Sequence, residues 1–139
     1  MSSLFNIPAR DHCALILMTE LAERFRDGEP LTLQDIARRM HLSQGYLEEI
    51  AGALKAAGLI RGKTGPRGGY VLARPPKKIS LHQILEAVEG PLELVACQAG
   101  RGNCLFAGKC SSQKAWGKLQ NAILKTLKNT SLEQTISIE

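Results

Sequence analysis

The chain has 139 residues, of which 44% are hydrophobic and 22% are charged, with a formal net charge of +5. This composition argues against a disordered or fibrous protein and provides enough apolar residues for one well-packed domain. The apolar runs are short and broken by charge, so no membrane-spanning helix is predicted. The N-terminus lacks the residue order of a secretory signal, and we therefore expect a cytoplasmic protein.

Positive charge is concentrated in the middle of the chain. Residues 50–85 contain seven lysines and arginines and no aspartate or glutamate. A stretch this long without a carboxylate favours a polyanionic partner, and nucleic acid is the leading candidate.

The first half of the sequence predicts three helices. Apolar residues recur at helical spacing from about Arg10 to Gly28, which predicts the first helix. Thr32 is expected to cap a second helix, since the acidic Asp35 follows it by three positions. After a short turn, Ser43 is expected to cap a third helix. Two short helices joined by a tight turn are typical of a helix-turn-helix.

A β-hairpin is predicted directly after the third helix. Residues 59–61 and 70–72 are expected to form its strands, and the turn-rich segment 62–69 joins them. A hairpin in this position is the wing of a winged helix-turn-helix. Lys63 and Arg67 lie in the connecting segment, where we expect them to contact phosphates or the minor groove.

The C-terminal half predicts a linker and three further helices. Pro75 and Pro76 favour an extended linker, and Ser80 is expected to cap the helix that follows. A long helix is predicted over 112–128, and a capping box that begins at Thr130 predicts a short final helix.

The long helix carries one apolar seam at near-heptad spacing, formed by Trp116, Leu119, Ile123 and Leu127. Such a seam must be buried against something. A second subunit is the favoured partner, and the first helix of the same chain is the alternative.

Three of the four cysteines, Cys97, Cys104 and Cys110, lie in one glycine-rich stretch, while Cys13 is expected to be buried in the first helix. Clustered cysteines in a reducing compartment indicate metal or redox chemistry rather than disulfides. Zinc is disfavoured because the stretch has no Cys-x-x-Cys pair. An iron–sulfur cluster suits thiolates spread along a loop, with a fourth ligand from elsewhere. No nucleophile–base arrangement is evident, so an enzyme is not predicted.

The predicted fold is mainly α with a small β-hairpin wing, a winged helix-turn-helix followed by a long C-terminal dimerisation helix. We expect a DNA-binding domain over 1–90 and a cysteine-rich, cluster-binding loop over 91–111. The dimerisation helix and a C-terminal arm would occupy 112–139.

The chain resembles the bacterial winged-helix regulators of the Rrf-two family, which includes IscR and NsrR. The resemblance covers nearly the whole chain and rests on six stretches: Leu31-Thr-Leu-Gln-Asp-Ile-Ala, Ser43-Gln-Gly-Tyr-Leu-Glu, Gly58-Leu-Ile, Gly65-Pro-Arg-Gly-Gly-Tyr, Ile84-Leu-Glu-Ala-Val-Glu-Gly and the three-cysteine loop. It implies a homodimer whose long helices cross, with each cluster loop near the partner's DNA-binding domain. A dimer of this kind binds a palindromic operator in double-stranded DNA.

The resemblance also implies that Ser43, Tyr46 and Glu48 open the recognition helix. A carboxylate there accepts a hydrogen bond from a cytosine amino group, and Gln44 is suited to pair with adenine.

The fourth cluster ligand differs from that of IscR-like members, in which a histidine lies three residues beyond the last cysteine. Gln113 occupies that position here. NsrR-like members use an aspartate in the first helix of the other subunit, and Asp11 matches it, with the neighbouring His12 as a second candidate. The first gap between cysteines is one residue longer than is common in the family, which leaves a two-iron and a four-iron cluster open.

These observations predict a DNA-binding transcriptional regulator, a repressor, that senses iron–sulfur cluster status, redox state or nitric oxide. The alternative hypothesis is a zinc-stabilised DNA- or protein-binding module without a sensing role.

Overall fold

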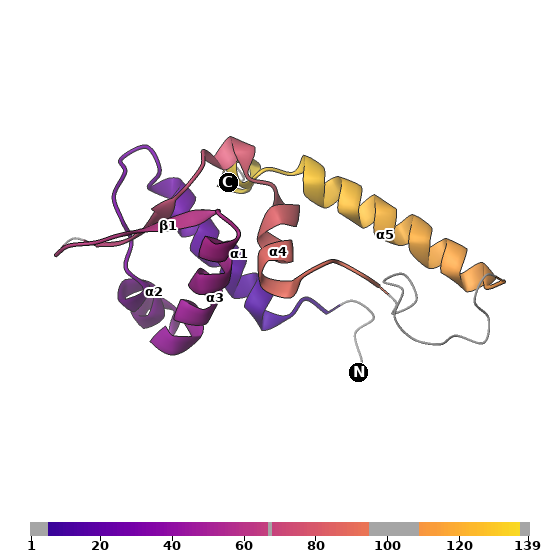
Figure 1. The fold of residues 1–139 in the computed structure, drawn as a ribbon, viewed down its shortest axis with the longest axis horizontal. Helices are drawn as coiled ribbons and strands as arrows, with labels where there is room; N and C mark the ends of the chain where they lie inside the picture. Colours follow the sequence, from indigo (N-terminus) through magenta and orange to yellow (C-terminus); the bar gives the residue numbers. More distant parts are fainter. Residues whose placement is uncertain (1–5, 67, 95–108, 137–139) are drawn as a thin grey trace.

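The computed structural model describes residues 6–66, 68–94 and 109–136. The hairpin and the long helix project from opposite sides of a body built from the other helices (Figure 1). The elements in chain order are α1 (Ala9–Glu23), α2 (Leu33–Met40), α3 (Gln44–Ala56), β1 (Ile60–Lys63), β2 (Gly69–Leu72), the 3₁₀ helix η1 (Pro76–Lys78), α4 (Leu81–Glu89), α5 (Ser111–Asn129) and α6 (Leu132–Ile136). The predicted winged helix-turn-helix with a long C-terminal helix is confirmed.

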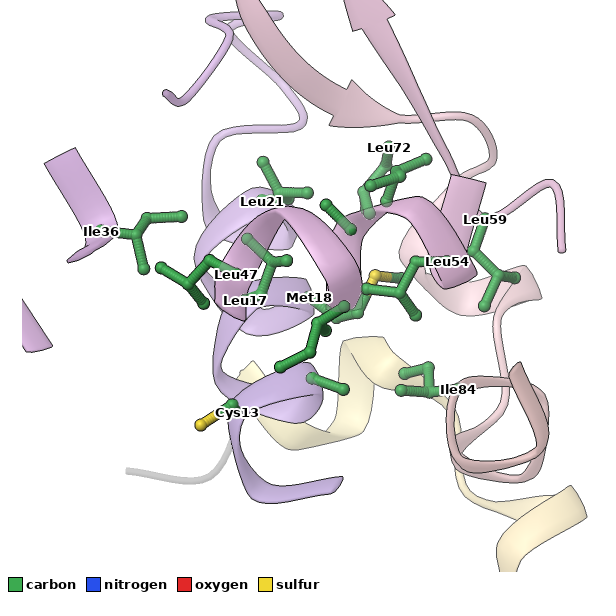
Figure 2. Close-up of a cluster of buried hydrophobic side chains, with 14 of the residues drawn as sticks. Cys13, Leu17, Met18, Leu21, Ile36, Leu47, Leu54, Leu59, Leu72 and Ile84 are labelled. Atoms are coloured by element: carbon green, nitrogen blue, oxygen red, sulfur yellow. The ribbon is translucent and has the colours of Figure 1, made fainter. Parts of the chain in front are cut away.

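Helix α1 is the centre of the hydrophobic core, because α3, α4, α6 and β2 all pack against it. Its apolar stripe, including Leu17, Met18 and Leu21, is almost fully removed from solvent (Figure 2). Burying each such side chain contributes about 1.5–3 kcal/mol. Cys13 is buried in the same core, as predicted. A displacement of α1 is therefore transmitted to most of the other elements.

The helix-turn-helix is stabilised by the two predicted caps. Thr32 accepts a hydrogen bond from the backbone N–H of Asp35 at 3.2 Å, and Ser43 accepts one from that of Tyr46 at 3.1 Å. Between α2 and α3, His41 has a φ of 56°, the left-handed conformation that closes the tight turn.

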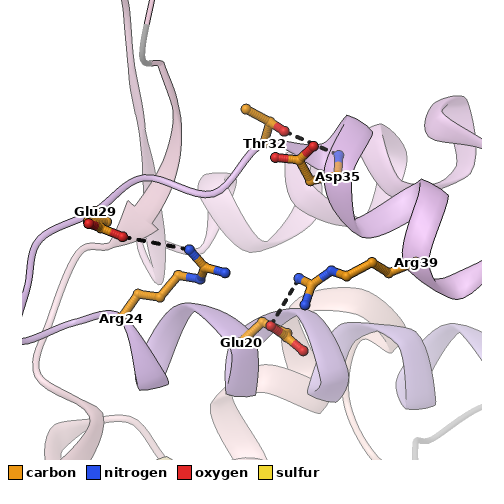
Figure 3. A network of polar contacts seen from close by, with 6 residues as sticks. All are labelled: Glu20, Arg24, Glu29, Thr32, Asp35 and Arg39. Carbon is orange, nitrogen blue, oxygen red and sulfur yellow. Dashed lines mark hydrogen bonds and ion pairs between the residues drawn. The ribbon is translucent and has the colours of Figure 1, made fainter.

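Two ion pairs hold α2 and the loop after α1 against the C-terminal half of α1 (Figure 3). Arg39 of α2 lies 3.1 Å from Glu20, and Arg24 lies 3.8 Å from Glu29 in the following loop. Ion pairs this close to solvent contribute less than about 1 kcal/mol each. The first pair orients α2 against α1, and the second holds the loop that follows α1.

The hairpin is joined to the body by a third segment. Strands β1 and β2 pair antiparallel, and Leu31 exchanges two backbone hydrogen bonds with Tyr70, at 3.0 and 2.9 Å. This close approach requires glycine at position 69. A Cβ there would lie 2.7 Å from the carbonyl oxygen of Leu31, and the φ of Gly69 is +148°.

Three local predictions differ from the structure. Helix α1 ends at Glu23, because its chain turns before Gly28, whose φ is 67°. The segment after Pro75 is a 3₁₀ turn rather than an extended linker, since Pro76 is buried at its first position, where a missing N–H costs nothing.

The third difference concerns the final capping box, which lies one residue later than predicted. Ser131 donates its backbone N–H to the Gln134 side chain at 2.8 Å, and the backbone N–H of Gln134 donates to the Ser131 hydroxyl at 3.3 Å. The shift follows from pairing of this segment with the body, because Leu132 donates its N–H to the carbonyl of Ile79 at 2.8 Å.

Replacing Gly69 tests the join between hairpin and body. Gly69→Ala should lower the free energy of unfolding by about 1–3 kcal/mol, because the added Cβ meets the Leu31 backbone and the φ is strained. The measurement is urea denaturation. As a matched control, Gly52→Ala in α3 places its Cβ in open space and should raise stability by about 0.5–1 kcal/mol. Equal effects of the two substitutions would contradict this account of the hairpin.

Candidate functional site

The start of α3 presents polar side chains to solvent. Ser43, Gln44 and Glu48 are exposed, whereas Tyr46 is half-buried against the core and Leu47 is fully buried. The structure therefore brings together the exposed residues predicted for DNA binding, on a helix whose opposite face is anchored in the core. Gln44 also donates a hydrogen bond to Glu48.

The wing also carries exposed positive charge. Lys63 is exposed and its Nζ donates to the carbonyl of Gly28 at 3.3 Å, which ties β1 to the loop after α1. Arg61 in the same strand and Lys55 at the end of α3 are also exposed. Arg67, the other predicted wing residue, lies outside the described residues.

Asp11 is the buried charged residue of α1, with 8% of its surface exposed. Its Oδ1 atom is enclosed and has no hydrogen-bond partner among the described residues. Burial raises the pKa of Asp11 from 3.8 to about 6, and a hydrogen bond with Glu89 and the charge of that residue add to the rise. The positive charge of Arg10 opposes it. Two carboxyl groups thus meet where α1 begins and α4 ends.

Asp11 opens into a pocket of about 420 Å³ between α1, α4 and the end of α5. Its lining carries four carboxyl groups, those of Asp11, Glu86, Glu89 and Glu93. His82 contributes the other titratable side chain, and its Nε2 lies 3.2 Å from Glu86. Across the described part of the chain, no three His, Cys, Asp or Glu side chains are arranged to hold one metal ion.

The cysteine site is described only at its last member. Cys110 is a half-buried free thiol at the N-cap of α5, where the unpaired N–H groups of the first turn favour negative charge. Gln113 is half-buried in that first turn. Cys97 and Cys104 lie outside the described residues.

Within one chain, Asp11 and Cys110 are far apart. Leu127 of α5 lines the pocket of Asp11. Cys110 precedes Leu127 by seventeen positions along a continuous helix, so the two residues are about 25 Å apart along the helix axis. Figure 1 shows the start of α5 pointing away from α1. His12, the second candidate ligand, is exposed beside Asp11.

Sequence reasoning missed Arg10 and Glu89. The Arg10 guanidinium donates to the Val88 carbonyl near the end of α4 at 3.1 Å. It also borders a smaller pocket of about 180 Å³, which Tyr46 and Glu49 of α3 line from the other side. These contacts join positions far apart in the chain, and no local pattern marks them. Arg10 thus links the helix that carries Asp11 to α4, and it borders a pocket that α3 also lines.

The seam of α5 is incompletely covered. Trp116, Leu119, Ile123 and Leu127 are half-buried, and α5 has no fully buried residue. The helix packs against α4 rather than along α1, so the first helix does not cover the seam.

A helix-turn-helix with a hairpin wing and an exposed polar start to its second helix defines a winged-helix DNA-binding protein. Residues 7–137 match the family model Rrf2, described as "Iron-dependent Transcriptional regulator". The chain therefore belongs to the Rrf2 family of transcriptional regulators, which are not enzymes.

Individual relatives agree with this assignment. The chain is 28% identical over 131 residues to the HTH-type transcriptional regulator IscR of Escherichia coli, a match that covers 94% of this chain and 80% of IscR. It is similar to the structure of CymR, the global cysteine regulator of B. subtilis, at 30% identity and a TM-score of 0.81, covering 97% of this chain and 98% of CymR. IscR of T. potens matches at 28% identity and a TM-score of 0.76, covering 96% and 87%.

None of the helices in the described ranges is long and apolar enough to cross a membrane.

The Asp11–Glu89 pair predicts a particular pH dependence of the free energy of unfolding. Because the pKa of Asp11 rises from 3.8 to about 6 on folding, its contribution to stability is complete below pH 3.8 and is lost as the pH rises through 6. Asp11→Asn should therefore be about 1–2 kcal/mol more stable than the wild type at pH 7.5.

The measurement is urea denaturation of both proteins between pH 4 and pH 8. Glu89→Gln removes the other carboxyl group and should reproduce part of the gain. A constant stability difference between Asp11→Asn and wild type across this range would contradict the proposed pairing.

Proposed function

We propose that the protein is a cytoplasmic, homodimeric transcriptional repressor whose operator affinity depends on an iron–sulfur cluster. Cys97, Cys104 and Cys110 of one subunit would hold the cluster together with Asp11 of the other. The observation that carries this proposal is the buried Asp11 oxygen that finds no hydrogen-bond partner in the described part of the chain. The description of the family as iron-dependent regulators supports an iron-based signal.

The donor set suits iron. A buried oxygen that accepts no hydrogen bond is costly, and a metal is one group that satisfies it. Three thiolates and one carboxylate provide four ligands, and the separation of Asp11 from Cys110 along α5 favours a second subunit as the source of the carboxylate. When bound, the cluster supplies iron centres whose charge and ligation change with redox state or nitric oxide. Both a two-iron and a four-iron cluster remain compatible with this set.

The chain's own contacts offer a route from Asp11 to DNA. Asp11 and Arg10 are adjacent at the start of α1, and Arg10 bonds the end of α4 while bordering the pocket beside Tyr46. We expect a change in the ligation of Asp11 to move the start of α1 and, through Arg10, the start of α3. A differential of about 1.4 kcal/mol between two arrangements changes their population ratio tenfold.

Dimerisation would complete both the cluster-binding site and the DNA-binding surface. The half-buried seam of α5 is suited to pack against the same seam of a second copy. Two recognition helices related by a two-fold axis match a palindromic operator. In this arrangement residues 1–90 bind DNA, 91–111 bind the cluster and 112–139 form the dimer.

A second candidate is a regulator that binds no cluster. The similarity to CymR favours it, because CymR is a cysteine regulator. The zinc-stabilised module is a third. An anaerobic preparation separates them, since a cluster gives a coloured protein with iron and sulfide. A colourless protein with stoichiometric zinc, or with neither metal, would reject the cluster.

Substitutions at the start of α1 test the fourth ligand. Asp11→Ala should hold less iron than the wild type after anaerobic purification and should lose the remainder faster on exposure to air, because one iron loses its carboxylate. His12→Ala, which alters the exposed neighbour, should retain the cluster like the wild type. The measurement is the decay of visible absorbance together with iron content. Equal decay in all three proteins would remove both residues as ligands.

Salt dependence tests the wing. Arg67→Ala should weaken binding to every DNA sequence by a similar factor. It should also reduce the magnitude of the slope of log affinity against log salt by about 1, the value for one lost phosphate contact. Lys125→Ala, which removes an exposed charge from α5, is the matched control and should leave the slope unchanged. Fluorescence anisotropy at several salt concentrations gives both slopes. An unchanged slope in Arg67→Ala would contradict a phosphate contact.

A further inference from the structure

The recognition helix begins with two polar side chains that contact each other. Gln44 is the first residue of α3, and Glu48 follows one turn later on the same exposed face. Nε2 of Gln44 donates a hydrogen bond to Oε1 of Glu48, at 3.3 Å. A carboxylate only accepts hydrogen bonds, so the nitrogen of the amide must face Glu48. The two side chains therefore approach a DNA groove as one unit.

This contact matters because a carboxylate is poorly suited to a DNA groove. The phosphates repel it, and entry into the groove removes its hydration. A donor on the same helix compensates one carboxylate oxygen. The second oxygen stays available, and a cytosine presents a single amino donor in the major groove. One free acceptor thus meets one donor.

We propose that Gln44 is a positioning residue for Glu48, holding its carboxylate in the orientation that accepts from a cytosine amino group. Gln44 would thereby set operator specificity at the base pair that Glu48 contacts, rather than contact adenine itself. The inference rests on the proposed DNA-binding function and deepens it.

Glu49 provides a matched control on the same helix. It is also exposed and carries the same charge, but it borders the pocket beside Arg10, and no hydrogen bond joins it to Gln44 within the described ranges. Any general effect of removing a negative charge from α3 should therefore appear in Glu49→Ala as well.

The test uses the full-length, anaerobically purified protein. Wild type and Glu48→Ala first select duplexes from a randomised library, which identifies the cytosine whose preference requires Glu48. Affinities are then measured for the selected duplex and for one in which 2-pyrimidinone, which lacks the amino group, replaces that cytosine. The ratio of the two affinities is the discrimination.

Gln44→Met keeps the length of the side chain and removes the amide, and it should lower the discrimination about three- to tenfold, the range for one lost hydrogen bond. Glu48→Ala should abolish the discrimination, and the double variant should equal Glu48→Ala, because Gln44 acts through Glu48. Glu49→Ala should retain the wild-type ratio. Melting temperatures of all variants confirm that each is folded.

Three results would overturn the proposal. If Gln44→Met changes the preference at another base pair and adds to the effect of Glu48→Ala, Gln44 contacts a base directly. An unchanged discrimination in Gln44→Met means that the pair is only a surface contact. If Glu48→Ala alters no base preference although the wild type binds DNA, base recognition by Glu48 fails together with the positioning role, while DNA binding by the protein stands.

Discussion

Asp11 places a carboxyl group inside the first turn of α1, with one oxygen that accepts no hydrogen bond from the described residues. A group in that condition destabilises the chain that contains it, and Glu89 adds a second carboxyl group instead of a counter-charge. The cost is tolerated because the rest of α1 is held in a large core by Leu17, Met18 and Leu21. An unfavourable position kept in place by a well-packed helix is expected where a ligand completes the site.

Asp11 lies at the start of the helix that contacts most of the other elements. The helix that carries it touches α3, α4, α6 and β2, so few elements are independent of its position. Arg10 extends this connection to the end of α4 and to the pocket beside the recognition helix. In the proposed account, one contact at the start of α1 is sensed at the dimer interface and transmitted to the surface that binds DNA. In the same account, the hydrogen-bonded pair of Gln44 and Glu48 would determine which base that surface prefers.

The sequence predicted those features that depend on neighbours along the chain. Thr32, Ser43 and Ser80 cap helices as expected, because an N-cap needs only a hydroxyl and the next turn of backbone. Local rules failed where distant packing decides the conformation, as at Pro76, which is buried in a 3₁₀ turn, and at Ser131, which caps α6 in place of Thr130. The contact of Arg10 with Val88 joins residues 78 positions apart and could not be predicted. The resemblance pointed to Asp11, but its burial and its carboxyl neighbour Glu89 required the structure.

A heterodimer tests most directly whether the site is completed across the dimer. One subunit carries Asp11→Ala and the other Cys110→Ala, with different affinity tags so that the mixed dimer can be isolated anaerobically. If the carboxylate comes from the partner, one of the two sites is intact, and the mixed dimer should contain about half the iron and sulfide of the wild type. Each variant homodimer should contain little of either. A mixed dimer that assembles but binds no more iron than the Cys110→Ala homodimer would contradict the account.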